Sequence, residues 1–154
     1  EKGRDALAAV ERHEVTPALE DVVEATIYLS GLGFENGGLA AAHAVNDGFA
    51  QEPQAHGMYH GEKVAFGTLV QLVLEKAPQE ELEQVLAFLR DTGLPLTLAQ
   101  LGVKEIVPET LKKVAEAAVV PTQSTKNLRA DITAQEVYNA ILEADRIGRD
   151  YLAR

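Results

Sequence analysis

Histidines gather in one part of this 154-residue chain: His43, His56 and His60 lie within eighteen residues of one another. A neutral imidazole with a free nitrogen is a common metal ligand. Catalytic zinc sites use three protein ligands and keep one coordination position open. His43 and His60 are therefore two candidate ligands of such a site. The remaining histidine, His13, stands among charged residues and is predicted to be a solvated surface residue.

Two residues are candidates for the third metal ligand. Asp47 is one, because residues i and i+4 share a helix face and His43 is expected inside a helix. His56 is the other, although the nearby proline and glycine argue against a helical pairing with His60. The spacing alone leaves a second interpretation open, in which these histidines are structural and satisfied by hydrogen bonds.

The expected surroundings of the two principal histidines suit metal binding. His43 stands among alanines and is expected to be buried or half-buried. His60 is expected at the start of a helix, where the helix dipole disfavours the imidazolium form and leaves a lone pair free. Both side chains would then be neutral, as a metal ligand must be.

The elements that must position these residues are helices, since nearly every long segment has helical periodicity. No stretch alternates strictly over five or more residues, so no strand is predicted. The fold class is all-α, with about six or seven helices in one domain and no internal boundary. Predicted helices start near residues 1, 17, 39, 60, 78, 108 and 134, and the segments 51–58, 96–101 and 121–131 are predicted connections.

Several helix ends carry recognisable signals. Thr16 and Pro17 predict a helix start, with a capping side chain followed by proline at the first helical position. Thr133 and Glu136 form the capping-box pattern of the last helix. Gly31 and Gly33 are predicted to end the helix that begins at Pro17.

Composition excludes several classes of function. The chain has 24 Asp and Glu against 14 Lys and Arg, a net charge of −10, which argues against binding to nucleic acid or to an anionic membrane. It has no cysteine, so disulfides, thiolate metal sites and cysteine nucleophiles are excluded. Neither a phosphate-binding glycine loop nor a serine nucleophile elbow is present. The absence of a signal peptide and of a membrane-length apolar run predicts a cytoplasmic protein.

Two motifs carry a specific resemblance. Residues 31–45 read GLGFENGGLAAAHAV, and residues 58–67 read MYHGEKVAFG. Residues 16–20 and 93–101 add the shorter stretches TPALE and GLPLTLAQL. Together they resemble the glycerol dehydrogenases, which belong to the iron-containing, or group III, alcohol dehydrogenase superfamily. The resemblance covers nearly the whole chain apart from the polar segment 121–130.

The resemblance implies that this chain corresponds to one of two domains with different roles. Family members have an N-terminal NAD-binding domain and a C-terminal helical domain, and residues 1–154 resemble only the latter. The family's zinc is held by one aspartate and two histidines, which implies His43 and His60 as metal ligands. The implied aspartate belongs upstream of Glu1 and is missing from this chain. Phe34 matches an aromatic residue that flanks bound glycerol, and Asn46 and Asp47 stand where relatives carry a further histidine.

The implied reaction is NAD-dependent oxidation of glycerol to dihydroxyacetone. Zinc would serve as Lewis acid and template, although iron, manganese or cobalt would suit the same ligands. The resemblance implies no further catalytic residue, and it leaves the NAD-binding residues unknown. Between Phe34 and Phe66 the only cation is Lys63, against four acidic residues, which favours an uncharged diol over a phosphorylated substrate.

Two functional readings follow. In the first, the chain is the C-terminal part of a glycerol dehydrogenase and is inactive alone, and the uncapped start at Glu1 indicates that something upstream was lost. In the second, it is a non-catalytic helical oligomerisation or metal-binding module that remained after loss of the NAD domain. Both predict a homo-oligomer, because the face left by the missing domain should be apolar around Phe34, Leu39 and Phe49.

Overall fold

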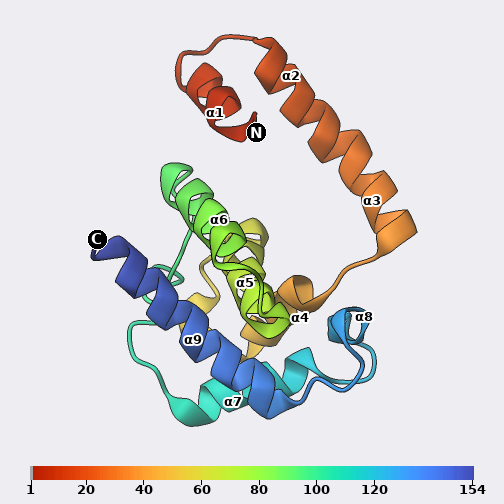
Figure 1. Ribbon diagram of the computed structural model, residues 1–154, viewed down its shortest axis with the longest axis vertical. Helices are drawn as coiled ribbons and strands as arrows, with labels where there is room; N and C mark the ends of the chain where they lie inside the picture. The colour runs from red at the N-terminus through yellow and green to blue at the C-terminus, as the bar shows by residue number, and fades with distance from the viewer. Residues whose placement is uncertain (1) are drawn as a thin grey trace. The chain divides into compact units, whose positions relative to one another are not determined.

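The computed structural model describes residues 2–154, which divide into two compact units, residues 2–38 and residues 39–154 (Figure 1). The described residues contain helices and turns and no strand, so the predicted all-α class is confirmed. The sequence carries no signal for the division at Gly38, because the glycines there resemble an ordinary turn between helices.

The first unit pairs a short helix with a long helical run. Helix α1 (Gly3–Glu11) contacts α2 (Pro17–Glu24), and His13 makes the turn between them with a positive φ of 55°. As predicted, Thr16 caps α2, accepting a hydrogen bond from the Leu19 backbone N–H at 3.3 Å. Small buried residues on α1, Ala6 and Ala9, allow the two helices to approach closely.

The helix that starts at Pro17 does not end at Gly31 and Gly33, so that prediction was wrong. A π-helical turn, η1 (Ala25–Leu29), leads directly into α3 (Ser30–Gly37). The helix ends only at Gly38, whose φ of 71° suits a residue without a side chain. A glycine weakens a helix by only about 1 kcal/mol relative to alanine, so the two glycines are tolerated where the flanking residues continue the helix.

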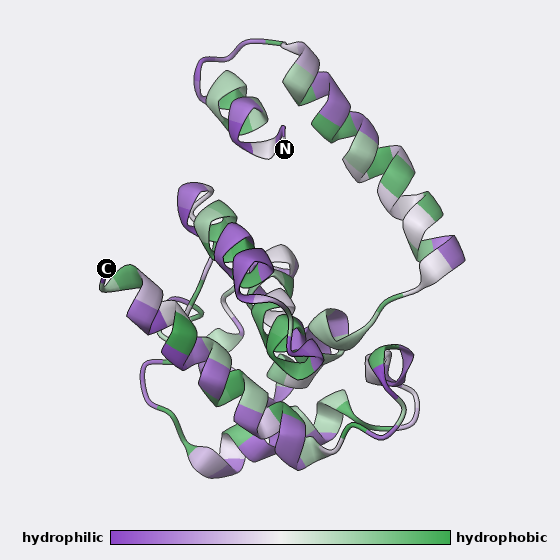
Figure 2. Ribbon diagram, viewed as in Figure 1, coloured by the Kyte–Doolittle hydropathy of each residue, from purple (hydrophilic) through white to green (hydrophobic). Residues whose placement is uncertain are grey.

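The second unit is a cluster of helices around one core. Helix α4 (Ala41–Gly48) packs against α5 (His60–Glu75) and α7 (Pro108–Ala118), and α9 (Ala134–Leu152) packs against α5 and α7. Helix α6 (Gln79–Asp91) contacts α5. Figure 2 shows α9 with a hydrophobic and a hydrophilic side, and its buried residues Val137, Ile141, Ala144 and Gly148 recur at helical spacing. The predicted capping box of Thr133 and Glu136 opens this helix.

The connections between these helices are partly helical themselves. Between α4 and α5 lie two 3₁₀ turns, η2 (Phe49–Gln51) and η3 (Pro53–Ala55). The segment 121–131, predicted as a loop, contains the short helix α8 (Thr125–Leu128). One turn is too short to show helical periodicity, so the pattern could not reveal α8. No helix within residues 2–154 combines the length and apolarity that crossing a bilayer requires.

The segment 96–101 is a connection, as predicted, but it lies in the core. Leu96, Leu98 and Leu101 are buried, and the carboxylate of buried Asp145 accepts a hydrogen bond from the Leu98 N–H at 2.9 Å. A Cβ atom at Gly148 would come within 1.9 Å of the Leu96 carbonyl oxygen. This segment is therefore fixed directly against α9.

Gly148→Ala is expected to lower the free energy of unfolding by about 1–3 kcal/mol, because the added methyl group overpacks a backbone contact. Urea unfolding followed by circular dichroism measures the change. Gly61→Ala is the matched control, since a Cβ there meets no atom within 4 Å. Equal stability of the two variants would contradict the close contact at Gly148.

Candidate functional site

His43 lies in the middle of α4, and the residues next to it along the helix are alanines with small side chains. Ala41, Ala42, Ala44 and Val45 are buried around it, whereas His43 itself is half-buried. These small side chains let the α4 backbone approach its neighbours closely. His43 is therefore half-buried on a well-packed helix, in agreement with the sequence prediction.

His60 is the first residue of α5, and its side chain is exposed. The start of this helix is stabilised by Glu62, whose carboxylate accepts a hydrogen bond from the Tyr59 backbone N–H at 2.7 Å. This contact satisfies a polar group next to the helix start and fixes the direction in which the chain enters α5. It thereby orients His60, the next residue.

The two rings lie side by side although they come from different helices. The ring centroids of His43 and His60 are 5.6 Å apart, with an angle of 48° between the ring planes. The structure thus brings together the two residues that the sequence analysis selected. Two imidazoles converging from separate helices present the kind of nitrogen donors that a divalent transition metal requires.

No third ligand joins this pair within residues 2–154. No group of three His, Cys, Asp or Glu side chains is arranged to hold a metal ion among them. Asp47 is exposed, and its carboxylate accepts a hydrogen bond from the Asn46 side chain at 3.0 Å. His56 is exposed in the connection, with Nε2 3.0 Å from the Ala50 carbonyl oxygen. Neither candidate for the third ligand is therefore brought into a three-residue site.

The proximity of the two histidines affects the protonation of His43. Burial lowers the pKa of His43 below 6.5, the positive charge of a protonated His60 lowers it further, and the carboxylate of Asp47 acts in the opposite direction. The neutral form of His43, which is the form that binds a metal, is therefore favoured at neutral pH.

His43 is expected to titrate below pH 6.5 in the folded chain, and His60→Gln is expected to raise that midpoint by removing the repulsion between the rings. Proton NMR of the imidazole signals measures both values. Because the pKa is lower in the folded than in the unfolded chain, His43 should reduce the stability of the fold as the pH falls through 6.5. An unchanged His43 midpoint in the His60 variant would contradict the interaction.

The connection between the two histidine-bearing helices is held by polar contacts that no pattern in the sequence indicates. The carboxylate of buried Glu52 accepts a hydrogen bond from the Gln54 backbone N–H at 3.0 Å. The side-chain oxygen of Gln54 accepts from the backbone N–H groups of Lys104 and Glu105 at 3.1 and 3.2 Å. Residues 52–54 are thus tied to residues 104–105, which restrains the chain between His43 and His60.

Of the three residues predicted to form an exposed apolar surface, Phe34, Leu39 and Phe49, only Phe34 is exposed. Phe34 lies on α3 in the first unit and is 54% exposed. Leu39 is half-buried, and Phe49 is fully buried, with its ring 6.1 Å from that of Phe66 in an edge-on contact. The prediction that Phe49 belongs to an exposed surface was therefore wrong, because η2 turns its side chain into the core.

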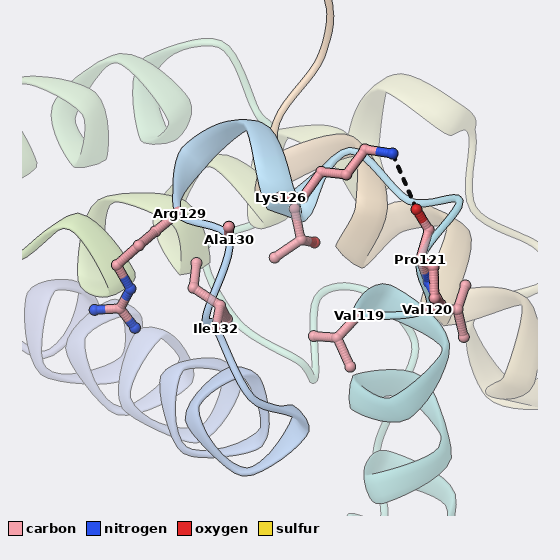
Figure 3. Close-up of a pocket in the computed structure, with 8 residues that line it drawn as sticks. Val119, Val120, Pro121, Lys126, Arg129, Ala130 and Ile132 are labelled. Atoms are coloured by element: carbon pink, nitrogen blue, oxygen red, sulfur yellow. Dashed lines mark hydrogen bonds between the residues drawn. The ribbon is translucent and has the colours of Figure 1, made fainter.

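A surface hollow elsewhere in the second unit does not involve the histidines. It has a volume of about 360 Å³ and lies between the end of α7 and residues 125–132 (Figure 3). The Lys126 ammonium there donates to the Pro121 carbonyl oxygen at 2.9 Å, and Arg129 forms ion pairs with Asp131 and Glu136.

Comparison with known proteins gives a consistent result. The chain is 56% identical to a glycerol dehydrogenase of Escherichia coli over 152 residues, which covers 99% of this chain and 41% of that protein. It is 49% identical to a glycerol dehydrogenase of Pseudomonas putida, covering 99% of this chain and 42% of that protein. A crystal structure of glycerol dehydrogenase from Schizosaccharomyces pombe matches with a TM-score of 0.93 and 39% identity, covering 97% of this chain and 38% of that chain. No family model matches. The chain thus spans about two fifths of the length of these relatives.

Proposed function

We propose that this chain is the metal-binding helical part of an NAD-dependent glycerol dehydrogenase, because it is similar along nearly its whole length to the C-terminal part of proteins named glycerol dehydrogenase. The observation that carries the proposal is the convergence of His43 and His60 within a chain matched along 99% of its length. Two half-exposed or exposed imidazoles on packed helices fit a divalent metal ion.

In this proposal His43 and His60 are the two metal ligands that the chain supplies. These two residues would hold a zinc ion, or another divalent metal, which would supply Lewis-acid chemistry by lowering the pKa of a substrate hydroxyl group. The low pKa of His43 keeps its nitrogen available as a donor near neutral pH. His43 and His60 hold their positions through α4 and α5 and transfer no proton.

The remaining parts of the site are assigned to the rest of the protein. The third metal ligand, an aspartate, and the nicotinamide site belong to the part of the relatives that this chain does not match. Phe34 is proposed to pack beside the carbon atoms of the substrate, which suits an apolar ring next to a small polyol. No NAD-binding residue is assigned within residues 1–154, and we place the protein in the cytoplasm with the NAD pool.

The proposed substrate is an uncharged diol such as glycerol. In the sequence between Phe34 and Phe66, Lys63 is the only Lys or Arg. Binding of a phosphate group is favoured by several Lys or Arg side chains. The same acidic balance, with a net charge of −10, supports a small neutral partner rather than nucleic acid or an anionic membrane.

The genomic DNA upstream of the Glu1 codon tests the proposal directly. An in-frame nucleotide-binding domain, followed by glycerol-dependent NADH formation by the complete expressed protein, is the expected result. A complete protein that binds no NAD and oxidises no diol would refute the proposal. It would favour the second candidate, a helical oligomerisation or metal-binding module without catalytic activity.

The exposed apolar residues of the long helical run support that second candidate and also predict self-association. Ile27 is 76% exposed, and Tyr28, Leu29, Leu32 and Phe34 are also exposed. Exposed apolar side chains of this kind favour contact with another copy of the chain. The proposed assembly is therefore a homo-oligomer.

Sedimentation at micromolar concentrations is expected to give a mass above that of the 16.6-kDa monomer. Ile27→Glu should shift the chain toward the monomer by placing a charge in the apolar contact. Val15→Glu is the control, because Val15 is an isolated exposed valine outside the helical run. A monomer at every concentration would contradict self-association.

A further inference from the structure

The first turn of α4, which precedes His43, is capped by a side chain from another helix. Ala40 is the N-cap residue, and alanine has no side-chain acceptor for the free N–H groups of the first turn. The side-chain oxygen of Gln71, on α5, accepts the hydrogen bond of the Ala42 N–H at 3.1 Å. Gln71, which follows Ala42 by 29 positions in the sequence, therefore caps α4 in place of a neighbouring side chain.

A second contact joins the same two helices at the same place. A Cβ atom at Gly67 would lie 2.4 Å from the Ala42 carbonyl oxygen, so the α4 backbone rests directly on α5 there. Ala42 is thus held by α5 through both its N–H and its carbonyl group. The next residue along α4 is His43.

The two contact residues on α5 lie on the helix face that carries His60. His60, Gly67 and Gln71 are separated by seven and four residues, and such spacings return to one face of an α-helix. The hydrogen bond and the close backbone contact therefore link the stretch of α5 that begins with His60 to the residue beside His43. Sliding or rotation of α4 against α5 would break both contacts.

The residues just before α4 are held from another direction. The Ser124 hydroxyl donates to the Ala40 carbonyl oxygen at 2.7 Å, and the Asn127 side chain donates to the Leu39 carbonyl oxygen at 2.8 Å. These contacts fix the entry of the chain into α4 but do not reach α5. The hydrogen bond of Gln71 consequently connects the start of α4 to α5, the helix that begins at His60.

We propose that Gln71 is a positioning residue for the His43–His60 pair, because its hydrogen bond to Ala42 sets how α4 sits on α5. This inference rests on the proposed function only where metal binding is the readout. The side chains of metal ligands depend on such supporting contacts, whose loss typically lowers metal affinity about 10–100-fold.

The test compares three variants of the chain. Gln71→Met keeps the length of the side chain but removes the acceptor for the Ala42 N–H. Gln71→Glu, made throughout in a Glu75→Gln background so that two carboxylates do not face each other, keeps an acceptor for the Ala42 N–H and reverses the direction of the 2.7 Å hydrogen bond between residues 71 and 75. Gln79→Met is the matched control, because Gln79 also bonds a glutamate four residues on, Glu83 at 3.1 Å, but lies on α6.

The first readout is NMR of the metal-free chain, which does not depend on the proposed function. Gln71→Met is expected to speed hydrogen exchange of the Ala42 amide and to weaken the cross-relaxation between the His43 and His60 rings. Gln71→Glu should restore both signals, and Gln79→Met should leave both unchanged. Wild-type signals in Gln71→Met, or equal losses in Gln79→Met, would overturn the positioning role.

The second readout is Co²⁺ binding followed by its visible absorption spectrum. Gln71→Met is expected to weaken Co²⁺ affinity about 10–100-fold, with Gln71→Glu at least as tight as the unmodified chain. If the unmodified chain binds no Co²⁺, the same variants are compared in the complete protein, because the proposed third ligand lies outside residues 1–154, and the NMR comparison still decides the role of Gln71. Should Gln71→Met unfold, Gln71→Asn takes its place, because its shorter amide cannot reach Ala42.

Discussion

The purified chain of residues 1–154 is expected to form no NADH from glycerol, with or without added zinc. Only two metal-ligating side chains converge in the part of the chain that the structure describes, and no nucleotide-binding residue is assigned there. Hydride transfer requires the nicotinamide and the alcohol to be held together in one site. The expected effect is complete loss, measured by NADH absorbance at high protein concentration.

The complete protein, expressed from the reading frame that includes the upstream DNA, is the positive control for that assay. Activity of the complete protein beside an inactive 154-residue chain would agree with the proposed division between the two parts. NADH formation by the chain alone, proportional to its concentration and lost in His43→Ala, would contradict that division. It would require a nicotinamide site among these helices.

His43→Ala and His60→Ala are each expected to abolish whatever zinc binding the chain shows in calorimetry. Each substitution removes one of two direct ligands, so the loss of affinity should exceed the 10–100-fold typical of a supporting residue. In the complete protein the same substitutions should eliminate activity while leaving the helical content unchanged, because His60 is exposed and His43 is half-buried.

The chain contains its own matched controls for this experiment. His13→Ala and His56→Ala remove a histidine outside the pair, and neither should change zinc affinity. Zinc binding that survives His43→Ala but is lost in His56→Ala would move the site to the connection between α4 and α5. Tight binding at one zinc per chain would instead require a third ligand from Asp47 or from a second copy of the chain.

Local signals in the sequence predicted the helix starts well. Thr16 with Pro17, and Thr133 with Glu136, are short-range arrangements whose hydrogen bonds form within a few residues, and the structure has both. Helix ends were harder to predict. Gly31 and Gly33 resemble stop signals, yet the helix continues to Gly37 because the residues around them keep helical geometry.

Long-range packing explains the remaining differences. Nothing near Phe49 indicates that η2 turns its ring against Phe66, seventeen residues later, so its exposure was predicted wrongly. The contact of Gln71 with Ala42 likewise joins residues that have no pattern in common. The pairing of His43 and His60 was expected from the resemblance to a family, because their chemistry and spacing alone also allowed a structural role. The packing that brings them together becomes visible only in three dimensions.

The π-helical turn at Ala25–Leu29 has a consequence for the angular setting of the long helical run. An α-helix advances about 100° per residue, and a π turn holds one residue more than an α turn. Removing one residue between Ala25 and Leu29 would let a regular α-helix form and would leave Phe34 at about the same angle around the helix axis relative to Pro17, because the π turn accommodates one extra residue. Conversion of the π turn to a regular α-helix without a deletion would instead turn Phe34 by about 100°. The π turn therefore sets the direction in which the side chains of α3 point.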